Sequence, residues 1–205
     1  MRPVSQFLSI ILHPLLMPSY ALVCYAFLFG SIARVLTPDY FMLLFVLIFC
    51  STFLLPLLSV FIMIRFGKIR SVYMEDQKER NWPLLQSAIV YAIAFYVLVQ
   101  ARRIPPVIPL FILGATGAMV VAMIVNLKWK ISLHMIGIGG LCGGVTSMFI
   151  MLQEGNPLWL ALLFLCAGTL GTARLILQAH NSLQILAGFV AGFAIEFGLL
   201  MLFSA

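Results

Sequence analysis

The fold is decided by the run Val107-Ile-Pro-Leu-Phe-Ile-Leu-Gly-Ala-Thr-Gly-Ala-Met-Val-Val-Ala-Met-Ile-Val125, which holds 19 residues and no charge. A helix that crosses a membrane needs about 20 predominantly apolar residues. The whole chain of 205 residues is 63% hydrophobic and only 9% charged, and its mean hydropathy is +1.14. A soluble domain of this size needs a charged exterior, so this composition excludes one.

Six further apolar runs flank this one, and none shows the alternation of a membrane barrel strand. Helices are then the way in which the backbone satisfies its hydrogen bonds in lipid. We expect an all-α, polytopic helical membrane protein, a single domain over residues 1–205 with six or seven transmembrane helices in a bundle. A short interfacial segment ending near His13-Pro14 should precede the first span. The expected spans are residues 15–33, 40–63, 83–99, 107–125, 134–152, 157–177 and 183–203.

The connections between these runs place three polar segments on one face of the membrane. Residues 67–82 follow the second span and carry four basic and three acidic residues. Residues 128–132 follow the fourth span, and residues 174–182 follow the sixth. An even number of crossings separates each pair, so a site built jointly from all three segments is topologically allowed.

The charges and cysteines exclude several classes of function. The net charge is +6, but the basic residues stand in short loops, where membrane orientation and anionic headgroups explain them better than nucleic acid. The four cysteines lie in apolar runs without CxxC or Cys/His spacing. We therefore expect no disulfide framework, no metal site and no cofactor. The first apolar run lacks a small-residue cleavage site and should stay in the membrane.

Polar side chains at or beside membrane depth are the candidate functional residues, because ionisable groups are costly there. Arg174, His180 and Gln184 stand between the last two spans, and His180 and Gln184 are spaced to touch on one helix face. Ser132 and His134 stand where the fifth span begins. Each has a simpler reading: a snorkelling Arg, a packing His, or a Ser that caps a helix. The glycines after His134, and the GxxxG spacing of Gly188 and Gly192, indicate close helix packing.

Together with the third polar segment, these residues suit the handling of phosphate. Lys78 and Arg80 lie just before the third span, although a solvated, self-paired charged loop is the default reading there. Phosphoryl transfer needs fixed positive charge around the phosphoryl oxygens, and Arg pairs with them through two donors. It also needs a nucleophile and a proton donor, and histidine serves in either role near neutral pH.

The motifs resemble those of the type 2 phosphatidic acid phosphatase superfamily. Arg174, five residues, His180, three residues and Gln184 resemble its third motif, Ser-Arg-x5-His-x3-Asp. Ile131-Ser132-Leu133-His134 is similar to its second motif, Pro-Ser-Gly-His. Glu79-Arg80-Asn81-Trp82-Pro83 is a compressed counterpart of its first, Lys-x6-Arg-Pro. The resemblance covers roughly residues 75–192.

The resemblance implies a membrane lipid phosphate phosphatase of a bacterial inner membrane that works without a metal. His180 would attack phosphorus and form a phosphohistidine, and His134 would protonate the leaving group. Arg174, Arg80 and Lys78 would clamp the phosphoryl oxygens with help from Ser132. Gln184 stands where the family keeps an Asp that orients the nucleophile, and Leu133 replaces a glycine. Both departures put turnover in doubt.

Two other functions therefore stay open: a catalytically impaired scaffold that binds lipid or serves in assembly, and a small transporter. A homo-oligomer is also left open. Orientation is contested, because nine of the twelve Lys and Arg residues lie on the side of the motifs. The positive-inside rule then favours a cytoplasmic site, whereas the resemblance implies a periplasmic one. We lean slightly to the periplasm, because a phosphate site attracts Lys and Arg for its own reasons.

Overall fold

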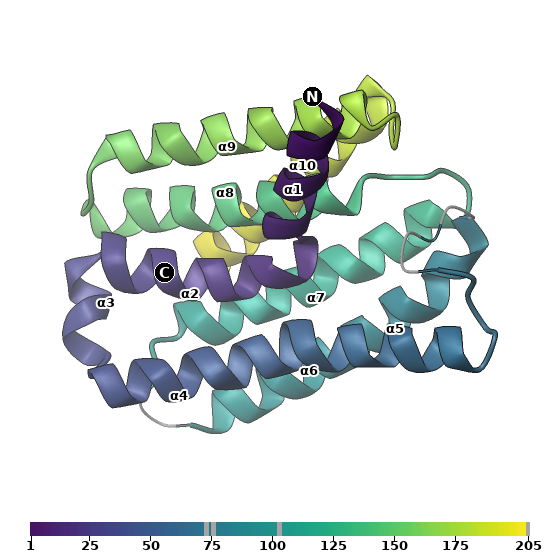
Figure 1. Cartoon of the computed structure of the whole chain (residues 1–205). Helices are drawn as coiled ribbons and strands as arrows, with labels where there is room; N and C mark the ends of the chain where they lie inside the picture. Colours follow the sequence, from purple (N-terminus) through teal and green to yellow (C-terminus); the bar gives the residue numbers. More distant parts are fainter. Residues whose placement is uncertain (72–73, 75–76, 102–103, 204–205) are drawn as a thin grey trace.

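The computed structural model describes residues 1–71, 74, 77–101 and 104–203, and every regular element in these ranges is helical. Seven stretches of the described chain are long and apolar enough to cross a membrane, which confirms an all-α polytopic bundle (Figure 1). The elements in order are α1 (Arg2–Ile11), η1 (Pro14–Leu16), α2 (Met17–Leu28), α3 (Gly30–Val35), α4 (Pro38–Phe49), η2 (Cys50–Leu54), α5 (Leu55–Arg65), η3 (Gln77–Arg80), α6 (Asn81–Gln100), α7 (Val107–Asn126), α8 (Leu133–Leu152), α9 (Pro157–Ile176) and α10 (Ser182–Phe203).

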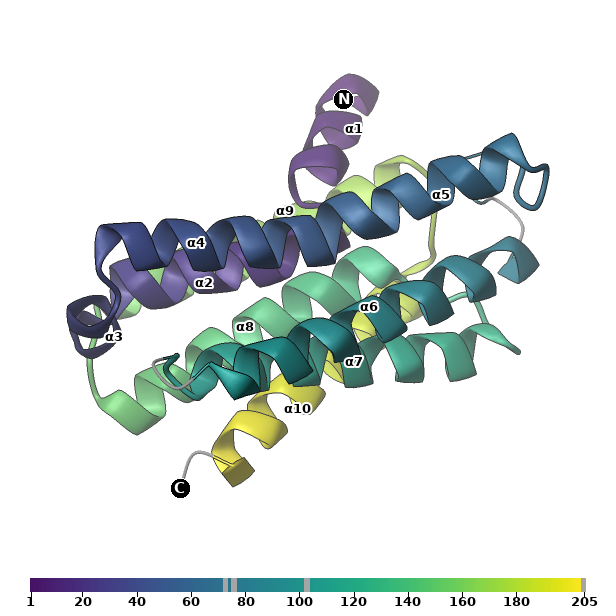
Figure 2. The same cartoon turned by 90° about the horizontal axis from the view of Figure 1, so that it is seen from below.

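The break expected near His13-Pro14 separates α1 from α2, and α1 stands at a steep angle to the bundle (Figure 2). Pro14 suits the first position of η1, where its missing N–H costs nothing. The expected span 15–33 is wrong as a single helix. Phe29 takes an extended backbone conformation, so α2 ends at Leu28 and α3 runs in another direction. Phe29 is itself fully buried, and its packing fixes this turn.

Helix α8 is the centre of the bundle. Two thirds of its most apolar stretch (67%) is buried, against 22% for α9. It packs against α2, α7, α9 and α10, and α10 crosses it obliquely (Figure 2). The outward faces of α4, α5 and α9 are rich in exposed Leu, Phe and Val. An outer surface of this kind suits lipid, which agrees with a multi-pass membrane protein.

Glycines bring α8 and α10 into backbone contact, as the GxxxG spacing predicts. A methyl group on Gly188 would come within 2.7 Å of the Ser132 carbonyl oxygen, and one on Gly192 would overlap the Ile136 carbonyl. From the other side, a methyl group on Gly139 would overlap the Phe189 carbonyl. Glycines of both helices therefore make the contact, and the start of α8 is held against the start of α10.

The three polar connections lie at the same end of the bundle, as the count of crossings predicts (Figure 1). The segments before α6, between α7 and α8 and between α9 and α10 all reach the right-hand end of that view. The connections before α4 and between α8 and α9 lie at the opposite end. The candidate residues are thereby carried to a common region.

Candidate functional site

Four of the seven sequence-predicted site residues line one cavity of about 230 Å³. These are Arg80, His134, Arg174 and His180, which come from η3, α8, α9 and the connection before α10. The remaining lining is mainly apolar and comes largely from α5, α6, α7 and α8, with Val60, Leu84, Ala118, Met119, Ala122 and Ile136 among its residues. The cavity thus has a basic, histidine-bearing part and an apolar part.

The three remaining predicted residues are Gln184, Ser132 and Lys78, and the first two are not among the residues that line the cavity. Gln184 acts on the cavity through His180, as described below. Ser132 is fully buried, and its Oγ has no hydrogen-bond partner among the described residues, but it does not line the cavity. Its backbone N–H donates to the Gln184 carbonyl at 3.4 Å, which ties the start of α8 to the start of α10. The backbone of Lys78 lies in η3, and its side chain lies outside the described part of the structure.

His180 is oriented by Gln184, as the four-residue spacing predicts. The His180 Nδ1 atom lies 3.0 Å from Gln184 Oε1. The same Oε1 accepts the backbone N–H of Asn181 at 3.2 Å, so it is an acceptor, and Nδ1 must carry the hydrogen. Asn181 in turn accepts the Gln184 backbone N–H at 2.9 Å. The free lone pair of the neutral ring is therefore on Nε2.

The electrostatics of this connection keep His180 neutral. Burial lowers the pKa of His180 to about 4, and the positive charges of Arg174 and Arg80 add to the effect. The hydrogen bond to Gln184 opposes this shift without cancelling it. An uncharged imidazole near neutral pH has the lone pair that a nucleophile needs.

His134 is held by the backbone of α1. Its Nε2 lies 3.0 Å from the Ser9 carbonyl oxygen, which can only accept, so Nε2 carries a hydrogen. The Nδ1 atom is then the position at which His134 gains or loses a proton.

The two arginines supply positive charge from different elements. Arg174 donates from Nη1 to Ser9 Oγ at 3.1 Å, and its buried Nε has no partner among the described residues. Arg80 donates from Nε to the Met74 carbonyl at 3.0 Å, and burial lowers its pKa. An unpaired buried guanidinium donor is costly unless an acceptor comes to it. The site therefore suits an anion.

A polar clamp between α7 and η3 places Arg80. The Asn126 side chain donates to the Gln77 carbonyl at 2.9 Å and to Asn81 Oδ1 at 2.8 Å. Gln77 returns a hydrogen bond to the Asn126 carbonyl. Glu79 pairs with the exposed Arg70 at 3.6 Å, so part of the loop is self-paired, as its charge pattern suggested. Arg80 at 9% exposure still faces the cavity.

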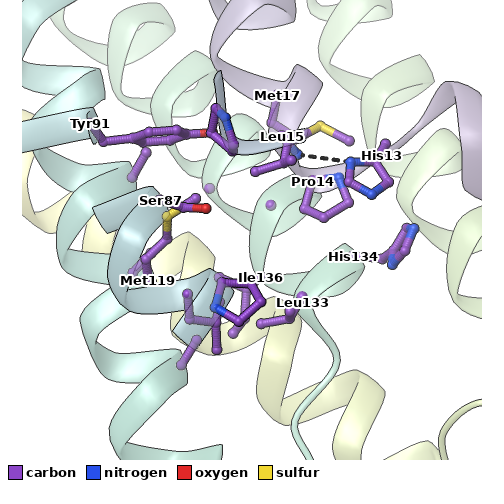
Figure 3. Close-up of a pocket in the computed structure, with 18 of the residues that line it drawn as sticks. His13, Pro14, Leu15, Met17, Ser87, Tyr91, Met119, Leu133, His134 and Ile136 are labelled. Carbon is purple, nitrogen blue, oxygen red and sulfur yellow. Dashed lines mark hydrogen bonds between the residues drawn. The ribbon is translucent and has the colours of Figure 1, made fainter. Parts of the chain in front are cut away.

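Three functional candidates escaped the sequence analysis: His13, Ser9 and Glu196. His13 lines the cavity beside His134, with ring centroids 5.5 Å apart (Figure 3). Its Nδ1 accepts the Leu15 backbone N–H at 3.3 Å, which leaves Nε2–H as a donor. In the sequence, His13 only marks the end of the short segment before the first span. Glu196 offered a signal, since a lone acid inside a transmembrane run is a functional candidate by default.

Figure 3 shows how these groups share the cavity. His13 and His134 lie together on one side, and Tyr91, Ser87 and Met119 lie across from them.

Comparison of the chain with protein-family models, curated proteins and solved structures finds no match. The function is therefore argued from the site alone.

Proposed function

We propose that this protein is a lipid phosphate phosphatase that hydrolyses a phosphomonoester or pyrophosphate lipid through a phosphohistidine intermediate. The observation that carries the proposal is the meeting of His180, His134, Arg174 and Arg80 on one cavity with apolar walls. The basic part suits a phosphate group, and the apolar part suits a lipid chain.

The first chemical step uses His180 and His134. The Nε2 lone pair of His180 attacks phosphorus, and the bond from phosphorus to the leaving oxygen breaks. The leaving oxygen keeps the electron pair and takes a proton from His134 Nδ1, which carries that proton when the anionic phosphate is bound beside it. Arg174 and Arg80 face the charge that develops on the phosphoryl oxygens. The products are the lipid alcohol, or the lipid monophosphate from a pyrophosphate, and phosphohistidine.

The second step reverses these roles. His134, now neutral, accepts a proton from water as the water oxygen attacks phosphorus. The phosphorus–nitrogen bond breaks, and its electron pair returns to His180 Nε2. Inorganic phosphate leaves, and the enzyme regains its starting protonation. Gln184 holds Nδ1–H of His180 through both steps.

Gln184 is consistent with turnover for a geometric reason. In a serine protease triad, replacing the Asp by Asn costs on the order of 10⁴ in turnover, because the histidine takes the wrong tautomer. Here the Asn181 N–H fixes the amide oxygen toward His180, so the tautomer is the productive one. The neutral amide still leaves the developing positive charge of His180 unbalanced, so we expect a slow enzyme.

The experiment measures phosphate release from lipid phosphates in mixed micelles by the purified protein. His180→Asn should abolish turnover by at least about 10³-fold, because Asn keeps a donor toward Gln184 but has no nucleophilic nitrogen. Radiolabelled substrate should leave an acid-labile, alkali-stable label on the wild-type chain and none on His180→Asn. Gln178→Ala is the control, since Gln178 is exposed in the same connection and should change nothing. A His180→Asn variant that turns over normally would refute the mechanism.

A second candidate, a lipid-binding scaffold without turnover, is favoured by Gln184 and by Leu133, which stand where the resembling motifs have Asp and Gly. It predicts that the wild-type protein binds lipid phosphate but releases no phosphate, and that Gln184→Asp restores hydrolysis. A wild-type protein that turns over, with Gln184→Asp raising the rate by about tenfold or more, instead favours a slow phosphatase. The two outcomes differ in the wild-type rate, so one assay separates them.

The location belongs to the same proposal. We assign the chain to a bacterial inner membrane, with the cavity open to the periplasmic side. The resemblance of the motifs carries this assignment. The grouping of Lys and Arg at that end favours the cytoplasm by itself, but Arg80 and Arg174 line the anion site and so have a second reason to stand there.

A further inference from the structure

A carboxyl group lies in the membrane-spanning part of the cavity. Glu196 projects from α10 into the bundle, is 1% exposed and lines the cavity. Its Cβ lies 4.0 Å from where a methyl group on Gly140 of α8 would stand, and its carboxyl fills the place of a side chain at Gly114 of α7. The missing side chain of Gly114 makes the room for this carboxyl.

One oxygen of the buried Glu196 carboxyl is unsatisfied, because Oε1 has no hydrogen-bond partner among the described residues. Tyr25 of α2 is a titratable group close enough to interact with this carboxyl electrostatically, and its buried hydroxyl is likewise without a described partner. A buried polar group is strongly unfavourable unless it is hydrogen-bonded, and a carboxyl in such surroundings holds a proton in place of a charge. A neutral carboxyl can both donate and accept, so the group suits a neutral polar ligand atom.

The depth of Glu196 in the cavity determines how far from the phosphate the polar ligand atom that it hydrogen-bonds must lie. Gly140 follows His134 by six residues on α8, which is about 9 Å along the helix axis at 1.5 Å per residue. A lipid whose phosphate lies among His134, His180 and Arg174 therefore meets Glu196 about 9 Å further in. In acylated lipid phosphates, the carbonyl oxygens of the acyl linkages lie several bonds from phosphorus. A polyprenyl phosphate is pure hydrocarbon at that depth.

We infer that Glu196 hydrogen-bonds an acyl-linkage oxygen of the substrate, which makes an acylated lipid phosphate, and not a polyprenyl phosphate, the substrate class. This inference rests on the proposed phosphatase function. A cation is a poorer fit, because hard cations need several oxygen ligands. Among the described residues, no group of three His, Cys, Asp or Glu side chains could hold a metal ion.

The test compares two substrates that differ only at the linkage: a diacylglycerol phosphate and its ether-linked dialkyl analogue, which lacks the carbonyl oxygens. Wild-type kcat/KM should favour the ester lipid by about tenfold, the ratio expected when a buried donor loses its acceptor. Glu196→Met, similar in length but unable to hydrogen-bond, should bring the ratio close to one. Glu196→Gln keeps a donor and an acceptor and should preserve most of the preference.

Two matched measurements keep the outcome decisive. Ser147→Ala is the control, because Ser147 is buried in α8, bonds its own helix at Gly144 and does not line the cavity. Its ester-to-ether ratio should equal that of the wild type. A wild-type protein that turns over both lipids equally overturns the inference, and so does an unchanged ratio in folded Glu196→Met. If neither lipid is hydrolysed, the phosphatase proposal fails, and the same ratio is measured by the binding of ester- and ether-linked phosphonates.

Discussion

At the scale of single residues, the proposed chemistry depends on a histidine that stays neutral inside a cluster of positive charge. His180 lies at 8% exposure within reach of the charges of Arg174 and Arg80. Burial lowers its pKa to about 4, from an ordinary value of 6.5, and these charges add to the shift. The same positive charges that would bind phosphate therefore help to keep the nucleophile unprotonated. One arrangement serves both requirements.

The pH dependence of His180 reactivity follows from this shift. Protonation removes the Nε2 lone pair, and a pKa of about 4 delays this loss to acidic pH. Carbethoxylation of His180 by diethyl pyrocarbonate, read by mass spectrometry of its peptide, should stay nearly constant from about pH 7 to about pH 5. A short peptide of residues 177–184 provides the comparison and should lose half its reactivity near its ordinary pKa. The same loss in the folded protein would contradict the burial argument.

At the scale of the elements, α1 links two residues of the site through hydrogen bonds. Ser9 of α1 holds Arg174 through its hydroxyl and His134 through its carbonyl. The helix contacts α9 and lies at a steep angle to the spans, with Val4, Phe7 and Ile10 exposed. A short amphipathic helix of this kind therefore couples two site residues that belong to different spans.

Removing the Ser9 hydroxyl should weaken the site without unfolding the bundle. Ser9→Ala deletes the hydrogen bond from Arg174 and should lower kcat/KM on lipid phosphates by about tenfold or more, as expected for one bond to a charged group. Ser5→Ala is the matched control, because Ser5 is buried on the same helix but bonds only the Met1 carbonyl. Equal losses in both variants would mean that α1 acts through folding and not through Arg174.

The contact between α8 and α10 is the other decisive element-scale feature. Gly192→Ala places a methyl group against the Ile136 carbonyl and should destabilise the protein by about 1–3 kcal/mol, the range for overpacking. Gly198→Ala on the same helix has nothing within 4 Å of the added methyl group and should be neutral or slightly stabilising. Thermal unfolding of both variants in detergent measures the difference. Equal unfolding midpoints for Gly192→Ala and Gly198→Ala would show that α8 and α10 can move apart to accommodate the methyl group without loss of stability.

At the scale of the whole molecule, the arrangement of seven spans puts the three polar connections on one face (Figure 1). Single cysteines in a cysteine-free background test this arrangement. Lys128→Cys and Ser182→Cys, both at exposed positions of the motif end, should react with a membrane-impermeant maleimide from the same side of sealed vesicles. Asp39→Cys, exposed at the other end, should react from the opposite side. Reaction of Lys128→Cys and Asp39→Cys from the same side of the vesicles would contradict this topology.

Hydropathy and the count of crossings were sufficient to predict the bundle and the common face of the motifs. They failed where tertiary packing overrides a local signal. No proline stands beside Phe29 in its apolar run, yet the chain turns there because Phe29 packs into the core. His13 looked like a boundary marker, since nothing in its neighbourhood shows that α1 folds back toward His134. Glu196 is a single acidic residue in a hydrophobic run. Its position against Gly114 depends on contacts between helices that are distant in the sequence.

The glycine-mediated pairing of α8 and α10 limits how such a protein can diversify. Where the two backbones touch, at Gly139, Gly188 and Gly192, there is no room for one added carbon, so we expect selection to remove substitutions there whatever the substrate. The cavity wall contributed by α5, α6 and α7, with Val60, Leu84 and Met119, carries no such restriction. A lineage adapting to a new lipid would therefore vary that wall and keep the seam, so variation among descendants should concentrate on one half of the bundle.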